Sequence, residues 1–189
     1  MQLQYNSPVI LTFFLLSLGA LFLGQWTDGW TTKHLFCVYR GSLKDPLFYI
    51  RLFGHVLGHA SWDHFFGNIM MLLVVGPLLE EKYGSANILF VILATALVTG
   101  VINFIFFPHV QLLGASGVVF AFILLASLTS IEEEKIPLTF ILVALIYIGQ
   151  QVYDGIFIRD NVSNLTHILG GIVGSGLGYV MNKNKMNRY

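Results

Sequence analysis

The sequence predicts an all-α membrane protein built as a bundle of six transmembrane helices. Of its 189 residues, 56% are hydrophobic and only 11% are charged, whereas a soluble domain carries about 25% charged residues. The mean hydropathy is +0.74. Six apolar segments approach the roughly 20 residues needed to cross a hydrocarbon core about 30 Å thick. We place these spans near residues 8–26, 62–80, 86–107, 113–130, 136–153 and 163–181.

The connections between the segments also fit a membrane bundle. Those between the last five are short and carry turn or charge signals, at residues 80–84, 107–109, 131–135 and 154–161. The long connection, residues 27–61, is rich in aromatic side chains together with its flanks, which is typical of a segment at the membrane interface. These side chains are Trp26, Trp30, Tyr39, Phe48, Tyr49 and Trp62. No second domain, repeat or low-complexity tract is visible, so we expect one membrane domain over residues 1–189.

The basic residues bear on the topology. An even number of spans places both termini on one side, and Lys183, Lys185 and Arg188 in the C-terminal tail favour the cytoplasm. The first loop argues the other way, because it carries Lys33, Arg40, Lys44 and Arg51 and this topology places it outside. We expect a multi-pass protein of the cell membrane with both termini in the cytoplasm. The first span lacks a basic leader and a cleavage site, so we expect it to be retained, and no transit peptide is visible, which favours a bacterial plasma membrane.

The composition gives little support to nucleic-acid or metal chemistry. The net charge is zero, so nothing suggests a nucleic-acid partner. The single cysteine, Cys37, cannot form an intrachain disulfide. His55 and His59 are spaced by one helical turn, but a zinc hydrolase of the His-Glu-x-x-His type also needs a glutamate that is missing here. We therefore expect no metal site.

A candidate nucleophile and a candidate base both lie within apolar segments. Ser116 stands in Gly114-Ala115-Ser116-Gly117, and His167 interrupts the last span. Polar groups are costly in hydrocarbon and indicate function by default, and a serine with a histidine can perform acyl transfer. The fourth span is short, so Ser116 would lie in the first turn of a helix that begins below the outer surface, where the helix dipole favours a developing oxyanion. The alternative is that this serine only caps its own helix.

Four polar side chains converge on one depth of the predicted membrane. Counted from the inner ends of their spans at 1.5 Å per residue, Ser116 and His167 both lie about 21–23 Å up. His64 and Asn68 in the second span lie about 18–24 Å up. Side-chain donors at this level could hold a carbonyl oxygen as it becomes negative. Their alternative role is hydrogen bonding between helices, which is common in membranes.

Glycines follow His167 on one helical face. Gly170, Gly174 and Gly178 recur every four residues, and such small-residue stripes let membrane helices approach closely. Gly117 and Ala121 are the residues of the fourth span that could face this stripe. Close approach there is what a Ser116–His167 hydrogen bond would need. The alternative is a packing stripe whose histidine is satisfied by a neighbouring carbonyl.

Taken together, these motifs resemble the rhomboid family of intramembrane serine proteases over roughly residues 50–181. The matching features are Gly114-Ala115-Ser116-Gly117, the pair His64 and Asn68 preceded by His59, and His167 followed by Gly170 and Gly174. The resemblance implies a six-helix bundle in which Ser116 is the nucleophile and His167 the general base, with no third acid. It also implies that the backbone N–H of Ser116 and the side chains of His64 and Asn68 hold the oxyanion.

Two further matches and two departures accompany the resemblance. Arg51 corresponds to the arginine of the family's Trp-Arg pair, and Glu81 with Gly84 fits the family's Glu-x-x-Gly turn. Ile50 stands where tryptophan is common, which would loosen the seating of the first loop in the bilayer. Phe120 stands where many members have a tyrosine packed on the catalytic histidine, and we expect the stacking and the activity to be retained.

The function implied by the resemblance is the hydrolysis of a peptide bond in or near a transmembrane helix of another protein. We expect membrane-protein substrates that enter laterally between the second and fifth spans, and a catalytic site open to the outer face. One alternative is a non-catalytic, rhomboid-like chaperone that binds membrane helices. A small transporter is the other, and it is disfavoured because no inverted repeat is visible.

Overall fold

The computed structural model describes residues 5–128 without a gap, and then residues 138–139, 141–142, 145–146, 149, 168–174, 176–177 and 180. Regular structure within these residues is helical, apart from one antiparallel bridge between Val38 and Leu112. The prediction of an all-α chain is confirmed for this part of the protein. The count of six spans stays a prediction, because much of the fifth span and parts of the sixth lie outside the described residues.

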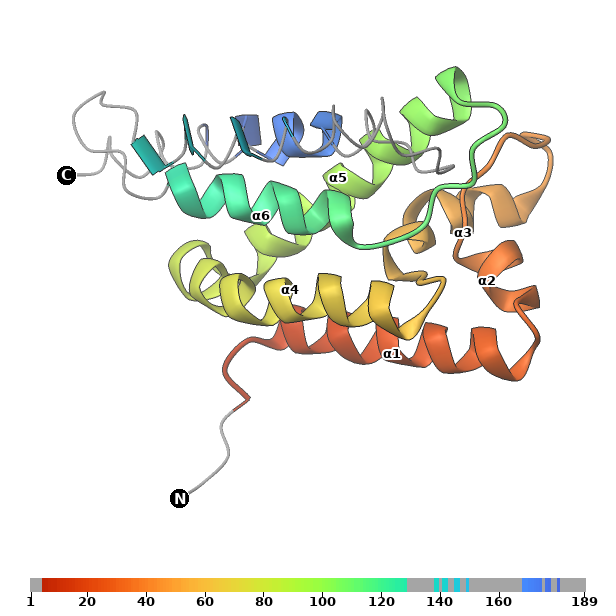
Figure 1. Cartoon of the computed structure of the whole chain (residues 1–189), viewed down its shortest axis with the longest axis horizontal. Helices are drawn as coiled ribbons and strands as arrows, with labels where there is room; N and C mark the ends of the chain where they lie inside the picture. The colour runs from red at the N-terminus through yellow and green to blue at the C-terminus, as the bar shows by residue number, and fades with distance from the viewer. Residues whose placement is uncertain are drawn as a thin grey trace.

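Four helices occupy the first four predicted spans (Figure 1). They are α1 (Pro8–Trp26), α4 (Trp62–Tyr83), α5 (Ser85–Phe106) and α6 (Ser116–Leu128). The first three are long and apolar enough to cross a membrane. Helix α6 has 13 residues, about 20 Å of helix. The described residues inside the predicted fifth and sixth spans, between positions 138 and 149 and between 168 and 180, are also helical.

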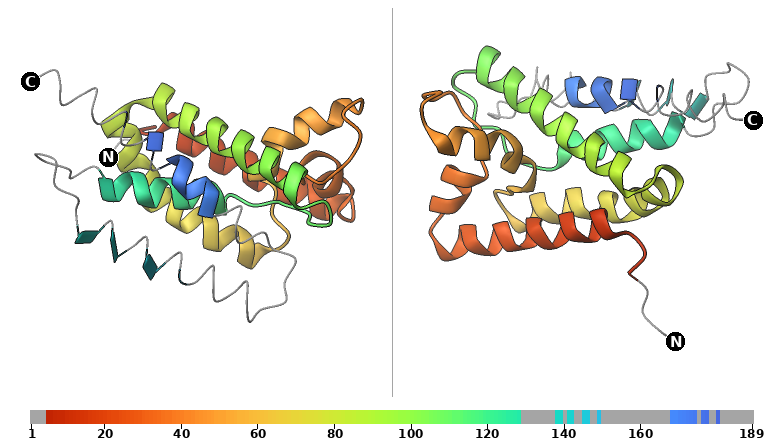
Figure 2. Two further views of the ribbon diagram at one scale, coloured as in Figure 1. Left: turned by 90° about the horizontal axis from the view of Figure 1, so that it is seen from above. Right: turned by 180° about the vertical axis from the view of Figure 1, so that it is seen from behind.

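Helix α6 lies at the centre of the described bundle. Figures 1 and 2 show α1 and α4 side by side, with α6 between α4 and the C-terminal helical segment and α5 crossing behind. Helices α4 and α6 begin at the same end of the molecule, as the alternating topology requires. Most side chains of α6 are buried, namely Val118, Val119, Phe120, Ala121, Phe122, Leu124 and Leu125. A helix that is apolar on every side belongs inside a protein, which explains why α6 can be short.

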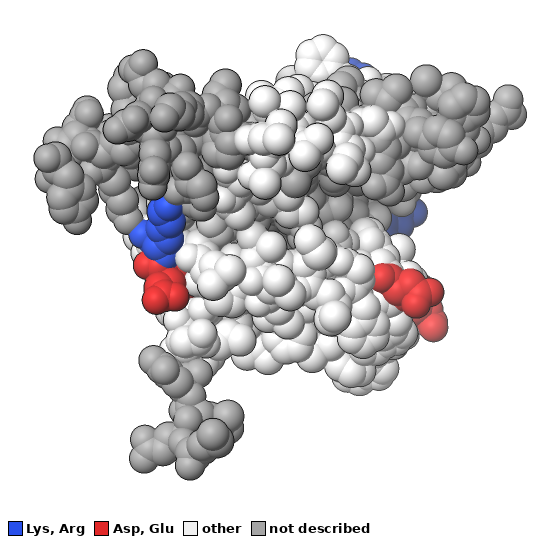
Figure 3. Space-filling view, turned by 60° about the vertical axis from the view of Figure 1, so that its left-hand side comes forward, with Lys and Arg blue, Asp and Glu red and all other residues white. Residues whose placement is uncertain are grey.

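The outer surface of the helices is apolar. Large side chains on α1, α4 and α5 are exposed, among them Leu16, Phe22, Met70, Val74, Leu78, Phe90 and Ile105. Figure 3 shows charged side chains at two edges of one face, with uncharged surface between them in the described part of the chain. An exposed apolar band of this extent marks contact with lipid. The surface therefore agrees with a membrane protein.

The long connection contains short helices that the sequence pattern did not reveal. They are α2 (Trp30–Leu35), α3 (Pro46–Gly54) and the 3₁₀ helix η1 (His55–Leu57). Asp45 caps α3 by accepting a hydrogen bond from the Leu47 N–H at 3.0 Å, and Pro46 takes the first helical position. This Asp-Pro pair was the available signal, because an acidic cap followed by proline is a common helix start.

Arg51 joins the parts of this connection. Its side chain is buried, forms an ion pair of 2.8 Å with Asp45, and stacks its guanidinium over the ring of Tyr39. The neighbouring Ile50 is half exposed. Arg51, which matches the family's arginine, therefore stabilises the connection from inside. Ile50, which replaces the family's tryptophan, faces outward.

The buried carboxylate of Glu80 joins α1 to the turn between α4 and α5. The Glu-x-x-Gly match in the sequence had pointed to its neighbour, Glu81. Glu80 accepts hydrogen bonds from the N–H groups of Val9 and Ile10 at 3.0 and 3.1 Å, and from the Ser85 hydroxyl at 2.7 Å. Glu81, selected with Gly84, is exposed. Helix phase decides between two adjacent glutamates, because only one of them can face α1. Gly84 does make the turn, with a φ of +83°.

Candidate active site

Ser116 opens helix α6, directly after an irregular stretch that is tied to the outer connection. Leu112 exchanges two backbone hydrogen bonds with Val38, and the Gly114 N–H donates to the carbonyl of His55 at 2.9 Å. These bonds fix the chain just before the serine. The prediction that Ser116 lies in the first turn of a helix is confirmed, because α6 begins at this residue. The first turn of any helix presents backbone N–H groups that have no acceptor within the helix, and Ser116 lies in that turn, half buried.

Gly114 brings His64 and Ser116 together. Its φ of +124° lies in a region that other residues rarely adopt. A Cβ at this position would lie 2.7 Å from Nε2 of His64 and 3.8 Å from Oγ of Ser116. The imidazole of His64 therefore packs directly on the Gly114 backbone, next to the serine hydroxyl. Two polar residues that the sequence places in different spans at one depth meet at this glycine.

Asn68 lies one turn further along α4 on the same side as His64. The helix starts at the cap of Ser61, whose hydroxyl accepts from the His64 N–H at 3.2 Å. The Asn68 side chain is buried, and its Nδ2 donates to the carbonyl of His64 at 2.9 Å. One N–H of the amide is therefore engaged along the helix, and the second is available for another acceptor.

The C-terminal helical segment approaches α6 through the predicted glycines. A Cβ at Gly170 would lie 3.4 Å from both the Cα and the carbonyl oxygen of Gly117, and one at Gly174 would overlap Ala121. These are the two partners that the stripe predicts, so this contact is confirmed. The backbones approach so closely because neither side carries a bulky side chain.

Phe120 packs on the same segment. Its ring is buried and lies against Gly171, where a Cβ would overlap the ring atoms. The predicted stacking partner was His167, which lies outside the described residues, as does Gly178. The structure therefore gives no distance between His167 and Ser116, and the base remains a prediction.

His55 is structural in this arrangement. It belongs to η1, and Gly58 separates it from His59 with extended backbone, so the two histidines do not share one helix as their spacing suggested. Its ring nitrogens bond the carbonyls of Arg51 and Leu52 and the hydroxyl of Thr99 at 3.1 Å. Within the residues that the structure describes, no cluster of His, Cys, Asp or Glu could hold a metal ion.

Polar residues of α5 support the site, and they were not predicted from the sequence. The γ-methyl of Thr99 lies 3.1 Å from the position of a Cβ on Gly170, while its hydroxyl bonds His55. Asn103 is buried, and its Nδ2 donates to the carbonyls of Val38 and Val110. The available signal was the recurrence of Thr95, Thr99 and Asn103 every four residues in an otherwise apolar span.

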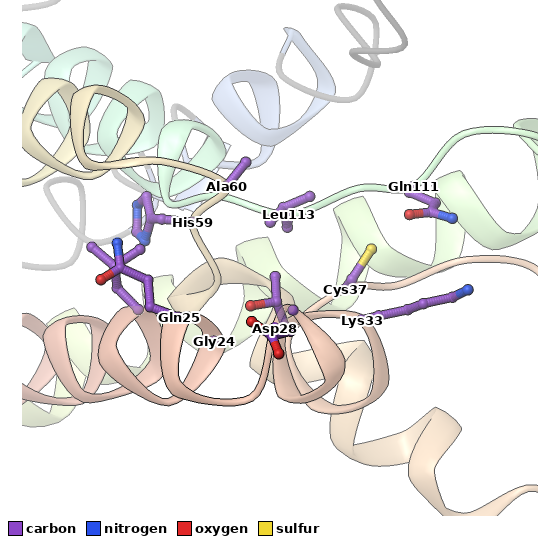
Figure 4. Close-up of a pocket in the computed structure, with 12 residues that line it drawn as sticks. Gly24, Gln25, Asp28, Lys33, Cys37, His59, Ala60, Gln111 and Leu113 are labelled. Carbon is purple, nitrogen blue, oxygen red and sulfur yellow. The ribbon is translucent and has the colours of Figure 1, made fainter.

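A pocket of about 440 Å³ opens beside the site. Figure 4 shows it between the C-terminal end of α1 and the segment that carries Gln111 and Leu113, with His59 at one end. Burial, followed by the nearby charge of His64, lowers the pKa of His59 to about 4, so its ring is neutral at ordinary pH. Gln25 and Asp28 add polar groups to the wall. The pocket thus ends at His59, whose ring packs on that of His64 at a centroid distance of 5.1 Å.

The sequence of this chain is similar to those of known proteins. The family model described as the rhomboid domain matches residues 47–184. Rhomboid-related protein 2 of Mus musculus is 30% identical over 195 residues, covering 92% of this chain and 65% of the mouse protein. Rhomboid protease GlpG of Haemophilus influenzae is 26% identical over 72% of each chain. Rhomboid protease GluP of Bacillus subtilis is 27% identical over 87% of this chain and 31% of that protein. The chain thus spans less than two thirds of several of the relatives that it matches.

Proposed function

This chain belongs to the rhomboid family, and we propose that it is an intramembrane serine endopeptidase that cleaves peptide bonds in or near the transmembrane helices of other membrane proteins. The observation that supports this most directly is the contact at Gly114, which sets the His64 ring beside the Ser116 hydroxyl at the start of α6. The close packing of Gly170 on Gly117 supports the pairing of the serine with the histidine three residues before Gly170 in the sequence.

In the proposed reaction, Oγ of Ser116 forms a bond to the carbonyl carbon of the scissile peptide while its proton passes to His167. The negative charge that develops on the carbonyl oxygen is held by the backbone N–H of Ser116 and by the side chains of His64 and Asn68. Collapse of this intermediate breaks the C–N bond, and His167 returns the proton to the leaving amine. Water then attacks the acyl-enzyme ester as His167 again accepts a proton. Collapse of this second intermediate breaks the bond between the carbonyl carbon and Oγ of Ser116, and His167 returns the proton to Oγ.

The proposed substrates are membrane proteins with a transmembrane helix that unwinds near the cut, where helix-breaking residues and a small residue are expected. Entry would be lateral, between α4 and the fifth span. Both termini would lie in the cytoplasm, so that the N-terminal ends of α4 and α6 and the catalytic site face the outer side. The proposed chemistry requires no metal and no organic cofactor.

A cleavage assay tests the proposal. Purified protein in lipid vesicles is offered a labelled transmembrane-helix substrate, beside the variants Ser116→Ala and His167→Ala. We expect cleavage by the wild-type protein and a loss in both variants. Binding of the helix without cleavage by the wild-type protein would instead favour a chaperone, and flux of a solute would favour a transporter.

A further inference from the structure

His59 is buried between the pocket and the proposed oxyanion site, and the proposed reaction gives it no role. It lies in the extended segment between η1 and α4, and its side chain is 2% exposed. Its ring packs edge-to-face on two neighbours, on Phe65 at a centroid distance of 5.3 Å and on His64 at 5.1 Å. It therefore stands directly behind the imidazole that lies against Gly114.

One hydrogen bond fixes the orientation of the His59 ring. Its Nδ1 lies 3.1 Å from the carbonyl oxygen of Leu57. A carbonyl can only accept, so Nδ1 carries the hydrogen and donates it. Nε2 is then a bare acceptor, and it is buried without a hydrogen-bond partner in the described part of the chain.

An unsatisfied buried acceptor costs free energy that a phenylalanine in the same space would not incur. Phenylalanine would keep the ring contacts but would lose the donor that anchors the ring to Leu57. A histidine at this position therefore supplies both an aromatic edge and an anchor for it. An unsatisfied buried group in a folded protein calls for such an explanation.

Among the described residues, the ring of His64 has no comparable anchor of its own. The hydrogen bonds of this residue use its backbone N–H and carbonyl, towards Ser61 and Asn68. The imidazole itself contacts the backbone of Gly114 on one side and the ring of His59 on the other. The orientation of this imidazole thus depends on the neighbours that enclose it.

We propose that His59 is a positioning residue, whose ring is anchored by the Leu57 carbonyl and sets the orientation of the His64 imidazole beside Gly114 and Ser116. This inference rests on the proposed protease function and on the role proposed for His64. Displacing an oxyanion donor weakens stabilisation of the transition state without weakening substrate binding. The loss of His59 should therefore lower kcat and leave KM unchanged.

Two substitutions separate the ring from its anchor. His59→Asn keeps a donor for the Leu57 carbonyl and removes the ring edge, whereas His59→Phe keeps a ring and removes the donor. We expect His59→Asn to lower kcat roughly 10-fold, less than the roughly 100-fold loss for removing one oxyanion donor outright. His59→Phe should retain more of the activity than His59→Asn does. His109→Asn, at an exposed histidine near the same end, is the control and should match the wild-type protein.

A double-mutant cycle with His64→Ala is the decisive test. If His59 acts through His64, adding His59→Asn to His64→Ala lowers kcat no further. Losses that multiply in the double variant, a rise in KM at constant kcat, or a wild-type kcat in both His59 variants would overturn the inference. The melting temperature of each variant in the same lipid identifies any loss that is only a loss of folded protein, and His59→Phe serves as the readout if His59→Asn does not fold. A wild-type protein that cleaves no substrate would instead defeat the proposed function itself.

Discussion

Gly114 has a positive φ and also a neighbour in the place where a side chain would go. The φ of +124° alone would strain any other residue, and a Cβ would in addition collide with the His64 ring. We therefore predict that Gly114→Ala lowers kcat/KM by about 100-fold, the loss expected when one oxyanion donor is displaced. Steady-state cleavage of the labelled helix measures this.

Gly84 provides the control for strain alone. It has a φ of +83°, and nothing lies within 4 Å of the position that a Cβ would take. Gly84→Ala should therefore cost about 1 kcal/mol of stability and leave kcat unchanged. Equal kinetic losses in the two alanine variants, or a wild-type rate for Gly114→Ala, would contradict this account of the site.

The depressed pKa of His59 predicts a dependence of stability on pH. The unfolded chain protonates this residue near pH 6.5, whereas burial delays protonation in the folded protein to about pH 4. Between these values the unfolded state binds more protons, so the free energy of unfolding falls as the pH falls, by on the order of 3 kcal/mol. Melting temperatures from pH 7 to pH 4 should decline less steeply for His59→Phe than for the wild-type protein. Parallel declines would contradict the prediction.

For single residues, the sequence predicts which side chains belong to the candidate site better than it predicts what surrounds them. Ser116 and His64 could be brought together by counting depth along two helices, because helix rise is regular. The conformation of Gly114 and the burial of Glu80 could not be predicted in this way, since both depend on contacts between segments distant in the chain. The role of His59 also became visible only when its two neighbouring rings were in place.

At the scale of elements, the contact between α6 and residues 168–174 determines the site, because it joins the helix of the serine to the segment that follows His167. A Cβ at Gly174 would overlap Ala121, so Gly174→Ala should push the helices apart and lower both the melting temperature and kcat. Adding Ala121→Gly removes the nearest of these contacts, but the Cα of residue 121 still lies 2.5 Å from the added Cβ, so we predict that the double variant recovers only part of each loss. Activity and thermal unfolding of the single and double variants measure this.

Gly176 is the matched control, because nothing lies within 4 Å of a Cβ placed there. Gly176→Ala should leave activity and stability unchanged. A loss in Gly176→Ala as large as that in Gly174→Ala would show that the close contact is not what matters.

Glu80 fixes the position of α1 relative to the turn between α4 and α5. Glutamine at this position removes the charge and replaces one of the two carboxylate oxygens with an NH₂ group. This NH₂ group would face the N–H and O–H donors that the oxygen now accepts from. We predict that Glu80→Gln lowers the free energy of unfolding by about 2 kcal/mol, whereas Glu81→Gln, on an exposed side chain, changes it little. Unfolding in mixed micelles compares the two, and equal effects would show that the buried contacts with Val9 and Ile10 contribute nothing.

The long apolar helices are predictable from sequence with boundaries close to those observed, because length and hydropathy alone specify a membrane span. Helix ends are less predictable. The second span is predicted to end at residue 80, where the charged residues begin, but α4 continues to Tyr83. The helices of the connection were missed, because α2 and α3 are too short to show a clear period and are held by Arg51 and by their caps.

At the scale of the whole molecule, the described bundle separates an apolar surface from a polar interior near one end. Helix α6 is mostly buried, exposed apolar side chains cover the helices around it, and buried polar side chains such as Arg51, His55 and His59 gather in the outer connection. This arrangement fits the proposed hydrolysis within a membrane, because irregular backbone such as that before Ser116 is tolerated at membrane depth where it is enclosed by protein.

The central claim is that Ser116 is a nucleophile activated by His167, and its reactivity can be measured without knowledge of the natural substrate. The protein in lipid vesicles is treated with a labelled fluorophosphonate, and the modified residue is identified by peptide mass spectrometry. We predict modification of the wild-type protein at Ser116, none in Ser116→Ala, and a rate at least 100-fold lower in His167→Ala. An unlabelled wild-type protein, or equal labelling of His167→Ala, would contradict the claim.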